Sequence, residues 1–150
     1  MFTSISDFLI RLAMKTPYWH LNGYMNRYWL VPFNRFTPSA RIHHILRSDD
    51  ARAYHDHPWS YITIILRGGY TEVTPVYNKS GLYQGEQRRW YSPGRVLFRK
   101  YNSWHRLELD EGKEAWTLFI SFSYRQKWGF LVTPDSKVSY NKYLGIEESK

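Results

Sequence analysis

The stretch Tyr54-His55-Asp56-His57-Pro58-Trp59 decides how the rest of the chain is interpreted. Side chains two apart on an extended strand point to the same face, so His55 and His57 present two imidazoles side by side. Pro58 cannot donate to a strand ladder and ends the strand, which leaves the histidine pair near the rim of a sheet. Taken alone, the pair is better explained by two surface histidines than by a metal site.

A series of short segments with strand character surrounds this stretch. Predicted strands cover residues 41–47, 61–66, 70–77, 86–91, 95–100, 104–109 and 115–124. Turn-forming residues separate them, as at Gly68-Gly69 and at Ser92-Pro93-Gly94. Many short strands without intervening helices predict a sandwich or a barrel.

A third histidine stands in a specific setting. The turn at Pro93-Gly94 opens the apolar strand 95–100, and a second turn then leads into His105. This arrangement resembles the two motifs of the cupins. The first is a His-x-His strand with a glycine closing the following hairpin, as His55, His57 and Gly68-Gly69 do here. The second is a Pro-Gly turn, a strand, a turn and a histidine, and the two together cover about residues 41–122.

A closer likeness is found in short strings of sequence. HHILRS, HDHPW, ILRGGYTE, WHRLEL, WTLFI and WGF resemble a small set of cupin-like proteins of bacteria and their bacteriophages. The resemblance implies an all-β, single-domain cupin-type double-stranded β-helix, or jelly-roll barrel, with a short N-terminal helix. It also implies one divalent transition metal ion, bound by His55, His57 and His105. Imidazoles serve iron, nickel, zinc, manganese and copper, so the element stays open.

Two departures from the cupin pattern affect the predicted site. The usual glutamate ligand falls four or five residues after the second histidine, where this chain has Tyr61 and Ile62. Its loss implies a three-histidine set similar to that of cysteine dioxygenase and other thiol dioxygenases. Glu72 lies past the hairpin, so we count it as a pocket residue first and a ligand second. Asp56 alternates with the histidines and is expected to face away from them.

The chain divides into three predicted parts. Residues 1–36 form an N-terminal helix and an aromatic connector that pack on the barrel, residues 37–133 form the barrel, and residues 134–150 form an irregular tail. Ser4 or Ser6 can cap the helix, and Pro17 closes it.

Several other side chains are candidates for a substrate pocket. His43 and His44 are adjacent on a strand, so at most one of them faces the barrel interior. Arginines inside a barrel would hold a carboxylate or phosphate, and those beside the third histidine are the favoured anchors. The full set of pocket candidates is His43, His44, Tyr61, Tyr70, Glu72, Arg99, Trp104 and Arg106.

Composition narrows the chemistry. Aromatic residues make up 19% of the 150 residues, so large rings must fill a core or line a pocket. There is no cysteine, which excludes disulfides and thiolate ligands. No apolar run approaches the roughly 20 residues that span a bilayer, so we expect a cytoplasmic protein without a membrane segment. The net charge of +8 favours anionic partners, although basic residues also keep an aromatic-rich protein soluble.

Three functions compete at this point. The first is a metal-dependent enzyme, dioxygenase-like or isomerase-like, acting on a small substrate, for which the basic charge balance suggests an anion. The second is a cupin that binds or senses a small ligand without turnover. The third is single-stranded nucleic-acid binding through basic and aromatic residues such as Gln87-Arg88-Arg89-Trp90-Tyr91. An exposed edge strand or the N-terminal segment could also support a homodimer.

Overall fold

The computed structural model describes residues 4–18, 20–21, 23–49, 53–133 and 136–145. Its elements in chain order are α1 (Ile5–Ala13), β1 (Met25–Val31), β2 (Ser39–Ile45), β3 (Tyr54–His55), β4 (Trp59–Arg67), β5 (Tyr70–Tyr77), β6 (Tyr83–Tyr91), β7 (Val96–Arg99), β8 (Arg106–Glu108), β9 (Ala115–Tyr124), β10 (Gly129–Thr133), β11 (Ser136–Ser139) and α2 (Tyr140–Leu144). No helix in these ranges has both the length and the apolar character needed to cross a membrane.

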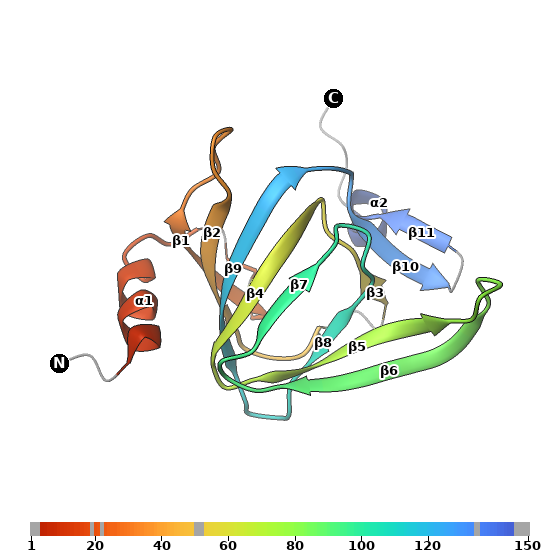
Figure 1. Cartoon of the computed structure of the whole chain (residues 1–150), viewed down its shortest axis with the longest axis horizontal. Helices are drawn as coiled ribbons and strands as arrows, with labels where there is room; N and C mark the ends of the chain where they lie inside the picture. The colour runs from red at the N-terminus through yellow and green to blue at the C-terminus, as the bar shows by residue number, and fades with distance from the viewer. Residues whose placement is uncertain (1–3, 19, 22, 50–52, 134–135, 146–150) are drawn as a thin grey trace.

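The strands form two facing layers. One layer is a five-stranded sheet in the order β1-β2-β9-β4-β7. The other consists of two three-stranded sheets, β11-β10-β3 and β6-β5-β8. An isolated antiparallel bridge between His55 and His105 connects these two sheets, with N···O distances of 2.8 and 3.1 Å. Figure 1 shows the five-stranded sheet on one side and β8, β5 and β6 along the opposite side.

The hydrophobic core lies between the two layers. Ile45, Ile65 and Ala115 of the five-stranded sheet meet Tyr70 and Leu107 of the facing sheet. All five side chains are buried. Burying one isoleucine of this kind stabilises the fold by about 1.5–3 kcal/mol. Because strand side chains alternate, the same pattern that builds this core points selected polar residues into the barrel.

Helix α1 covers the outer face of the five-stranded sheet. Ser4 caps the helix by accepting a hydrogen bond from the backbone N–H of Asp7 at 3.2 Å. Ile10 and Ala13 pack against Ile42 of β2 and other outward side chains of the sheet. The predicted all-β jelly roll with a short N-terminal helix is therefore confirmed.

Each strand predicted from the sequence is present, with ends that differ by three residues or fewer. Strand β1 is an addition, since it lies in the segment predicted to be an aromatic connector. Its outward side chains Tyr28 and Leu30 pack in the cluster beneath α1, while Trp29 faces inward against Arg41. With large apolar groups on both faces, the strand lacks the alternation that would have identified it.

The C-terminal region is also more ordered than predicted. Residues 136–144 form β11 and α2 where we expected an irregular tail. Tyr140 stacks on Trp128 with centroids 4.8 Å apart, and Tyr143 stacks on Phe130 at 4.0 Å. These ring contacts give a polar segment enough apolar burial to fold onto β10. Residues 134–135 and 146–150 of the predicted tail lie outside the described residues.

Asp56 anchors the segment between the two histidines of the His-x-His motif. Its carboxylate is 1% exposed and accepts hydrogen bonds from Gly129 N at 2.8 Å, Gln126 Nε2 at 2.7 Å and Lys137 Nζ at 2.6 Å. The side chain points away from the histidines, as the alternation predicted, but it is buried rather than on the surface. It ties the histidine segment to β10 and β11.

We expect Asp56→Ala to lower the free energy of unfolding by about 2–4 kcal/mol, because it leaves the buried Gly129 N–H unpaired. Denaturant unfolding measures the change. Asp110→Ala, in an exposed turn, is the control and should shift stability by less than about 0.5 kcal/mol. Equal effects of the two substitutions would contradict the anchoring role.

Candidate metal centre and adjoining pocket

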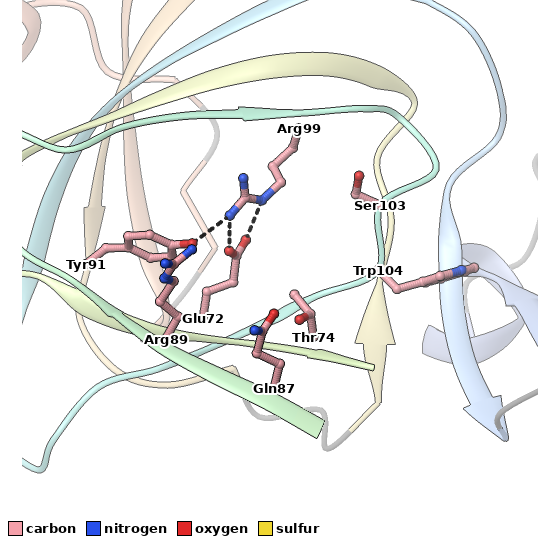
Figure 2. Close-up of a pocket in the computed structure, with 8 residues that line it drawn as sticks. All are labelled: Glu72, Thr74, Gln87, Arg89, Tyr91, Arg99, Ser103 and Trp104. Atoms are coloured by element: carbon pink, nitrogen blue, oxygen red, sulfur yellow. Dashed lines mark hydrogen bonds and ion pairs between the residues drawn. The ribbon is translucent and has the colours of Figure 1, made fainter. Parts of the chain in front are cut away.

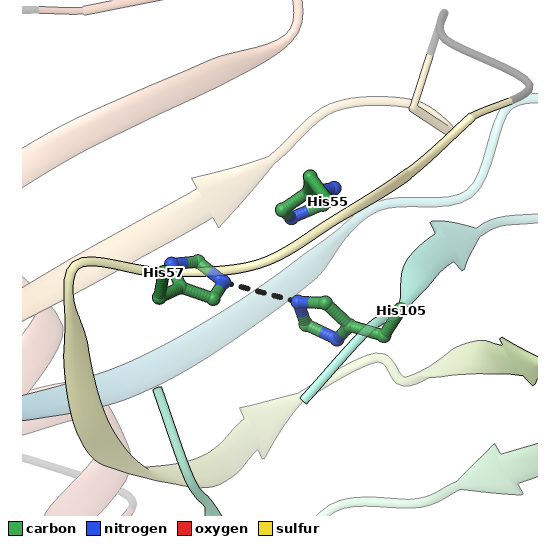
Figure 3. A group of neighbouring side chains, drawn as sticks. All are labelled: His55, His57 and His105. Carbon is green, nitrogen blue, oxygen red and sulfur yellow. Dashed lines mark hydrogen bonds between the residues drawn. The ribbon is translucent and has the colours of Figure 1, made fainter. Parts of the chain in front are cut away.

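Three histidines meet in the barrel interior. His55 ends β3, His57 follows in the connection to β4, and His105 directly precedes β8. Each offers a ring nitrogen, and these atoms lie within 4.8 Å of one another. His57 Nε2 and His105 Nε2 are 3.0 Å apart, and the rings of His55 and His105 are 4.6 Å apart between centroids. Figure 3 shows the three imidazoles turned toward one another.

The backbone that positions these rings differs from the sequence interpretation in one respect. We expected His55 and His57 on one strand, but β3 ends at His55. The short strand leaves His57 in a connecting segment, held in place by hydrogen bonds of the flanking Asp56 and of its own backbone N–H to Tyr101 O at 3.2 Å. The two rings still lie close, with centroids 5.2 Å apart.

One carboxylate orients the His105 ring through a hydrogen bond, and a second lies near the His55 ring. His105 Nδ1 lies 2.9 Å from Glu72 Oε1, which directs Nε2 toward His57. His55 Nδ1 lies 3.7 Å from Asp49 Oδ2. Asp49 is itself fixed, because it accepts a hydrogen bond from Leu107 N at 2.7 Å and pairs with the hydroxyl of Tyr24. Carboxylate partners of this kind fix the tautomer and raise the basicity of metal-binding histidines.

Electrostatics keeps the imidazoles in the form that binds metals. Burial, reinforced by His105, lowers the pKa of His55 to about 4. Burial and the neighbouring histidines also lower the pKa of His57 well below its usual value. Burial alone would raise the pKa of Glu72, but hydrogen bonds from His105 and Arg99 hold it at about 2. Both imidazoles are therefore neutral and Glu72 is ionised at pH 7, as metal ligation requires.

The donor set fits a single transition metal ion. Two imidazole nitrogens bound to one ion at about 2.1 Å lie at most about 4.2 Å apart. The 3.0 Å separation of the His57 and His105 nitrogens falls inside that limit. The largest separation allowed within the cluster, 4.8 Å, is slightly longer than the limit, and a small rotation of one ring would shorten it enough. Three imidazole ligands suit iron, cobalt, nickel, copper or zinc.

Tyr61 points into the cluster from β4. Its hydroxyl lies 3.2 Å from His105 Nε2, and its ring stacks on Phe119 at a centroid distance of 4.7 Å. This is a position at which the cupin pattern places a carboxylate ligand. Burial, with the nearby Glu72, raises the pKa of the Tyr61 phenol well above its usual value. The group is thus a neutral hydrogen-bond donor beside the histidines.

A polar cavity of about 360 Å³ adjoins the histidine cluster. Its walls are Glu72, Thr74, Gln87, Arg89, Tyr91, Arg99, Ser103 and Trp104 (Figure 2). The inward faces of β5 and β6 supply most of them, because the hairpin register pairs Glu72 with Arg89 and Thr74 with Gln87. Arg99 reaches across from β7, pairs with Glu72 through two nitrogens and donates to the Tyr91 hydroxyl at 3.1 Å. Glu72 belongs to both the cavity wall and the histidine cluster.

The charge in this cavity favours an anionic occupant. Its walls carry two guanidinium groups, Arg89 and Arg99, against the single carboxylate of Glu72. The Glu72 carboxylate neutralises Arg99, and the Arg89 guanidinium adds one positive charge. Hydroxyl and amide groups of Thr74 and Gln87 add hydrogen-bonding capacity.

Other pocket candidates from the sequence lie elsewhere. His43 faces the interior, stacked on Phe119 at 4.8 Å, whereas His44 faces outward, stacked on Trp116 and 2.7 Å from Glu114. Strand alternation thus separates the two, as expected. Tyr70 is part of the hydrophobic core rather than the cavity wall.

Of the two remaining candidates, Trp104 lines the cavity and Arg106 does not. Arg106 lies on the outer face, where it pairs with Glu86 at 2.7 Å and covers the Tyr54 ring. It does not line the cavity, because residue 106 faces away from the interior when residue 105 faces into it. Trp104 does line the cavity.

The sequence interpretation missed Arg89, Gln87, Thr74 and Asp49. The first three could have been found by continuing the alternation from Glu72 and pairing it across the β5–β6 hairpin. Asp49 had no such signal, because it is a turn residue whose contact with the cluster depends on the folding of distant strands.

Comparisons with known proteins were made by sequence and by structure. The chain matches no protein-family model and no curated protein. Among solved structures, it is similar to a cupin-like protein from Thermotoga maritima, with a TM-score of 0.52 and 20% identity over 84% of this chain and 86% of that one. It is also similar to the polyketide cyclase RemF from Streptomyces resistomycificus, with a TM-score of 0.51 and 14% identity over 69% of each chain.

A third similar structure is Fe(II)-HppE with the alternative substrate (S)-1-HPP. Its TM-score is 0.50 at 14% identity, and the match covers 66% of this chain and 50% of the HppE chain. This chain therefore spans about half the length of HppE. The closer likeness to small bacterial and bacteriophage proteins stays a prediction. The two-layered barrel and these likenesses together show that the chain has the cupin fold.

Proposed function

We propose that this chain binds one divalent transition metal ion through His55, His57 and His105 and uses it to act on a small anionic molecule in the adjoining cavity. The observation that carries the proposal is the convergence of three imidazoles beside a cationic, polar cavity. The iron-containing HppE structure with a bound substrate supports a role for this fold in metal-dependent chemistry on small molecules. Identity of 14% restricts that support to the fold.

The residues of this chain would have distinct roles. A bound ion would supply a Lewis acid with open coordination positions, as three protein ligands do in catalytic sites. Glu72 would hold the His105 ring in its ligating orientation. Tyr61 would donate a hydrogen bond to a substrate oxygen near the cluster, and Arg89 would attract the anionic group of the substrate.

A ligand-binding cupin without turnover is the second candidate. The phenol of Tyr61 at the position of the usual carboxylate ligand favours it, because a neutral group leaves a weaker donor set. In such a binder, replacing His105 would change ligand affinity while no catalytic rate exists to be lost. A small-molecule turnover screen with the metal-loaded protein separates the two candidates.

We expect protein purified without an affinity tag to contain close to one equivalent of metal by elemental analysis. The double variant His55→Ala/His57→Ala should lose it, because two of the three nitrogen donors are gone. His44→Ala is the matched control and should keep the metal, since His44 faces away from the cluster. Absence of metal after reconstitution with iron, nickel, copper, manganese and zinc would overturn the proposal.

We expect Glu72→Gln to weaken metal binding by about 10–100-fold, because the His105 ring loses the carboxylate that orients it. Competition against a chelator of known affinity measures the change. Glu86→Gln is the control, since it removes an arginine-paired carboxylate on the outer face. If both variants bind metal as tightly as the unmodified protein, Glu72 has no orienting role.

A further inference from the structure

Three buried nitrogen atoms have no hydrogen-bond partner in the described part of the chain: Arg41 Nε, His43 Nε2 and Trp59 Nε1. Arg41 and His43 both lie against the Phe119 ring, and Trp59 lies beside Arg41. They occupy the end of the barrel away from the apolar core around Ile45 and Ile65. Arg41 and His43 are two apart on β2 and face the same side, and the Trp59 ring lies 5.2 Å from Arg41 Cζ. Arg41 Nε and Trp59 Nε1 are hydrogen-bond donors, and buried donors without a partner are rare in folded proteins. Two of them side by side indicate a missing acceptor.

Arg41 is the most unusual of the three. It is 3% exposed, and among the described residues its guanidinium has no carboxylate partner. Its Nη2 atom donates a hydrogen bond to Ser121 Oγ at 3.3 Å. The rings of Trp29, Phe33 and two other aromatic residues surround Cζ at 5.1–5.3 Å. Cation–π contacts offset part of the cost of burying the charge, but they leave the Nε–H group without a hydrogen-bond partner.

The cation remains charged at neutral pH. Burial and the nearby Arg27 lower the pKa of Arg41 to about 10, still far above pH 7. Burial, Arg41 and Arg27 likewise lower the pKa of His43, which keeps that imidazole neutral. This end of the barrel is therefore a positive, low-dielectric environment, and no carboxylate of the described residues is paired with Arg41.

A second cavity, of about 480 Å³, opens at the same end. The segment between β1 and β2, Trp59 and the end of β9 form its walls. Phe33 and Trp59 touch both this cavity and Arg41, and the wall residue Ser39 bonds Ser121, the hydrogen-bond partner of Arg41. No acidic side chain is among the described residues of the wall, whereas the cationic Arg35 is.

We propose that this second cavity binds a small organic oxyanion, a carboxylate or phosphate ester with an aromatic or apolar body. The oxyanion would accept hydrogen bonds from Arg41 and Trp59 Nε1, and the body would lie against the aromatic wall. The Phe33 ring is 48% exposed on the irregular segment before β2, lines the cavity and lies 5.2 Å from Arg41 Cζ, so it would turn aside as the anion reached Arg41. The donors and the wall would together recognise an amphipathic anion.

This site goes beyond the metal chemistry proposed above. Both sites border the Phe119 ring, which lies 5.9 Å from the His57 ring and 5.1 Å from Arg41 Cζ. Neither Arg41 nor Trp59 belongs to the histidine cluster. Binding of an oxyanion here therefore needs no metal and can be measured in chelator-treated protein.

The test is a titration of metal-free protein with phenyl phosphate and, separately, with benzoate at constant ionic strength. Tryptophan fluorescence and calorimetry are the readouts, and benzyl alcohol is the neutral probe with the same ring. We expect saturable binding of at least one anion at one equivalent, with benzyl alcohol much weaker. Which of the two anions binds more tightly distinguishes a phosphate-type from a carboxylate-type ligand.

Variants locate the binding. Arg41→Met should weaken it by more than about tenfold, and Trp59→Phe, which keeps the ring but removes the donor, by about tenfold. Arg125→Met removes an exposed cation outside the cavity wall and should leave the affinity unchanged. The anion should raise the Tm of the unmodified protein but not of Arg41→Met, which a purely structural role for Arg41 would not produce.

Three results would overturn the proposal. These are no saturable binding of either anion, unchanged affinity in both Arg41→Met and Trp59→Phe, and loss of binding on Arg89→Met instead. The last result would place the anion in the cavity beside Glu72 and would support the proposed function while excluding this site. If Arg41→Met does not fold, Trp59→Phe alone decides the outcome.

Discussion

The backbone bridge between His55 and His105 is the constraint on which the rest of the site depends. Its two hydrogen bonds join the sheet β11-β10-β3 to the sheet β6-β5-β8. Residues directly opposite each other in an antiparallel pair project their side chains to the same face. The contact that completes the second layer of the barrel therefore also sets two imidazoles side by side. Closure of the barrel and assembly of the histidine cluster are one structural event.

The barrel interior is divided into regions of different character. Beyond the apolar core, the Glu72 carboxylate belongs both to the wall of the polar cavity and to the histidine cluster. The charge in the cavity is therefore coupled to the orientation of the His105 ring. Phe119 also borders the aromatic cage around Arg41, which is formed by the rings of Trp29, Phe33, Trp59 and Phe119. Well-packed apolar side chains in place of buried charges are often neutral or stabilising, so stability alone does not account for these buried charges.

Much of this arrangement could be predicted from local pattern. Strand alternation separated His43 from His44 and turned Asp56 away from the histidines, and turn residues set most strand ends. Contacts that depend on the pairing of distant strands could not be predicted. Glu72 was placed near the pocket, yet its bond to His105 requires the β5–β8 register. Arg106 was expected in the pocket, but the register that turns His105 inward turns Arg106 outward.

Arg41 shows a different limit of sequence reasoning. An arginine on a strand is ordinarily solvated, and nothing local to residues 39–45 indicates that four aromatic rings from separate segments enclose it. Strand β1 was missed for a related reason, since helix α1 covers its outer face and removes the alternation. In both cases the decisive neighbours are distant in sequence.

Stacked aromatic rings link the histidine cluster to helix α2 through packing contacts. Tyr143 of α2 stacks on Phe130, and the Phe130 ring lies 6.2 Å from that of His55. Phe130 also pairs with His55 through the β3–β10 ladder. A chain shortened before α2 would expose one face of Phe130 to water and remove the packing that supports the His55 side of the cluster. The last helix thus acts as a brace for a residue almost ninety positions earlier in the sequence.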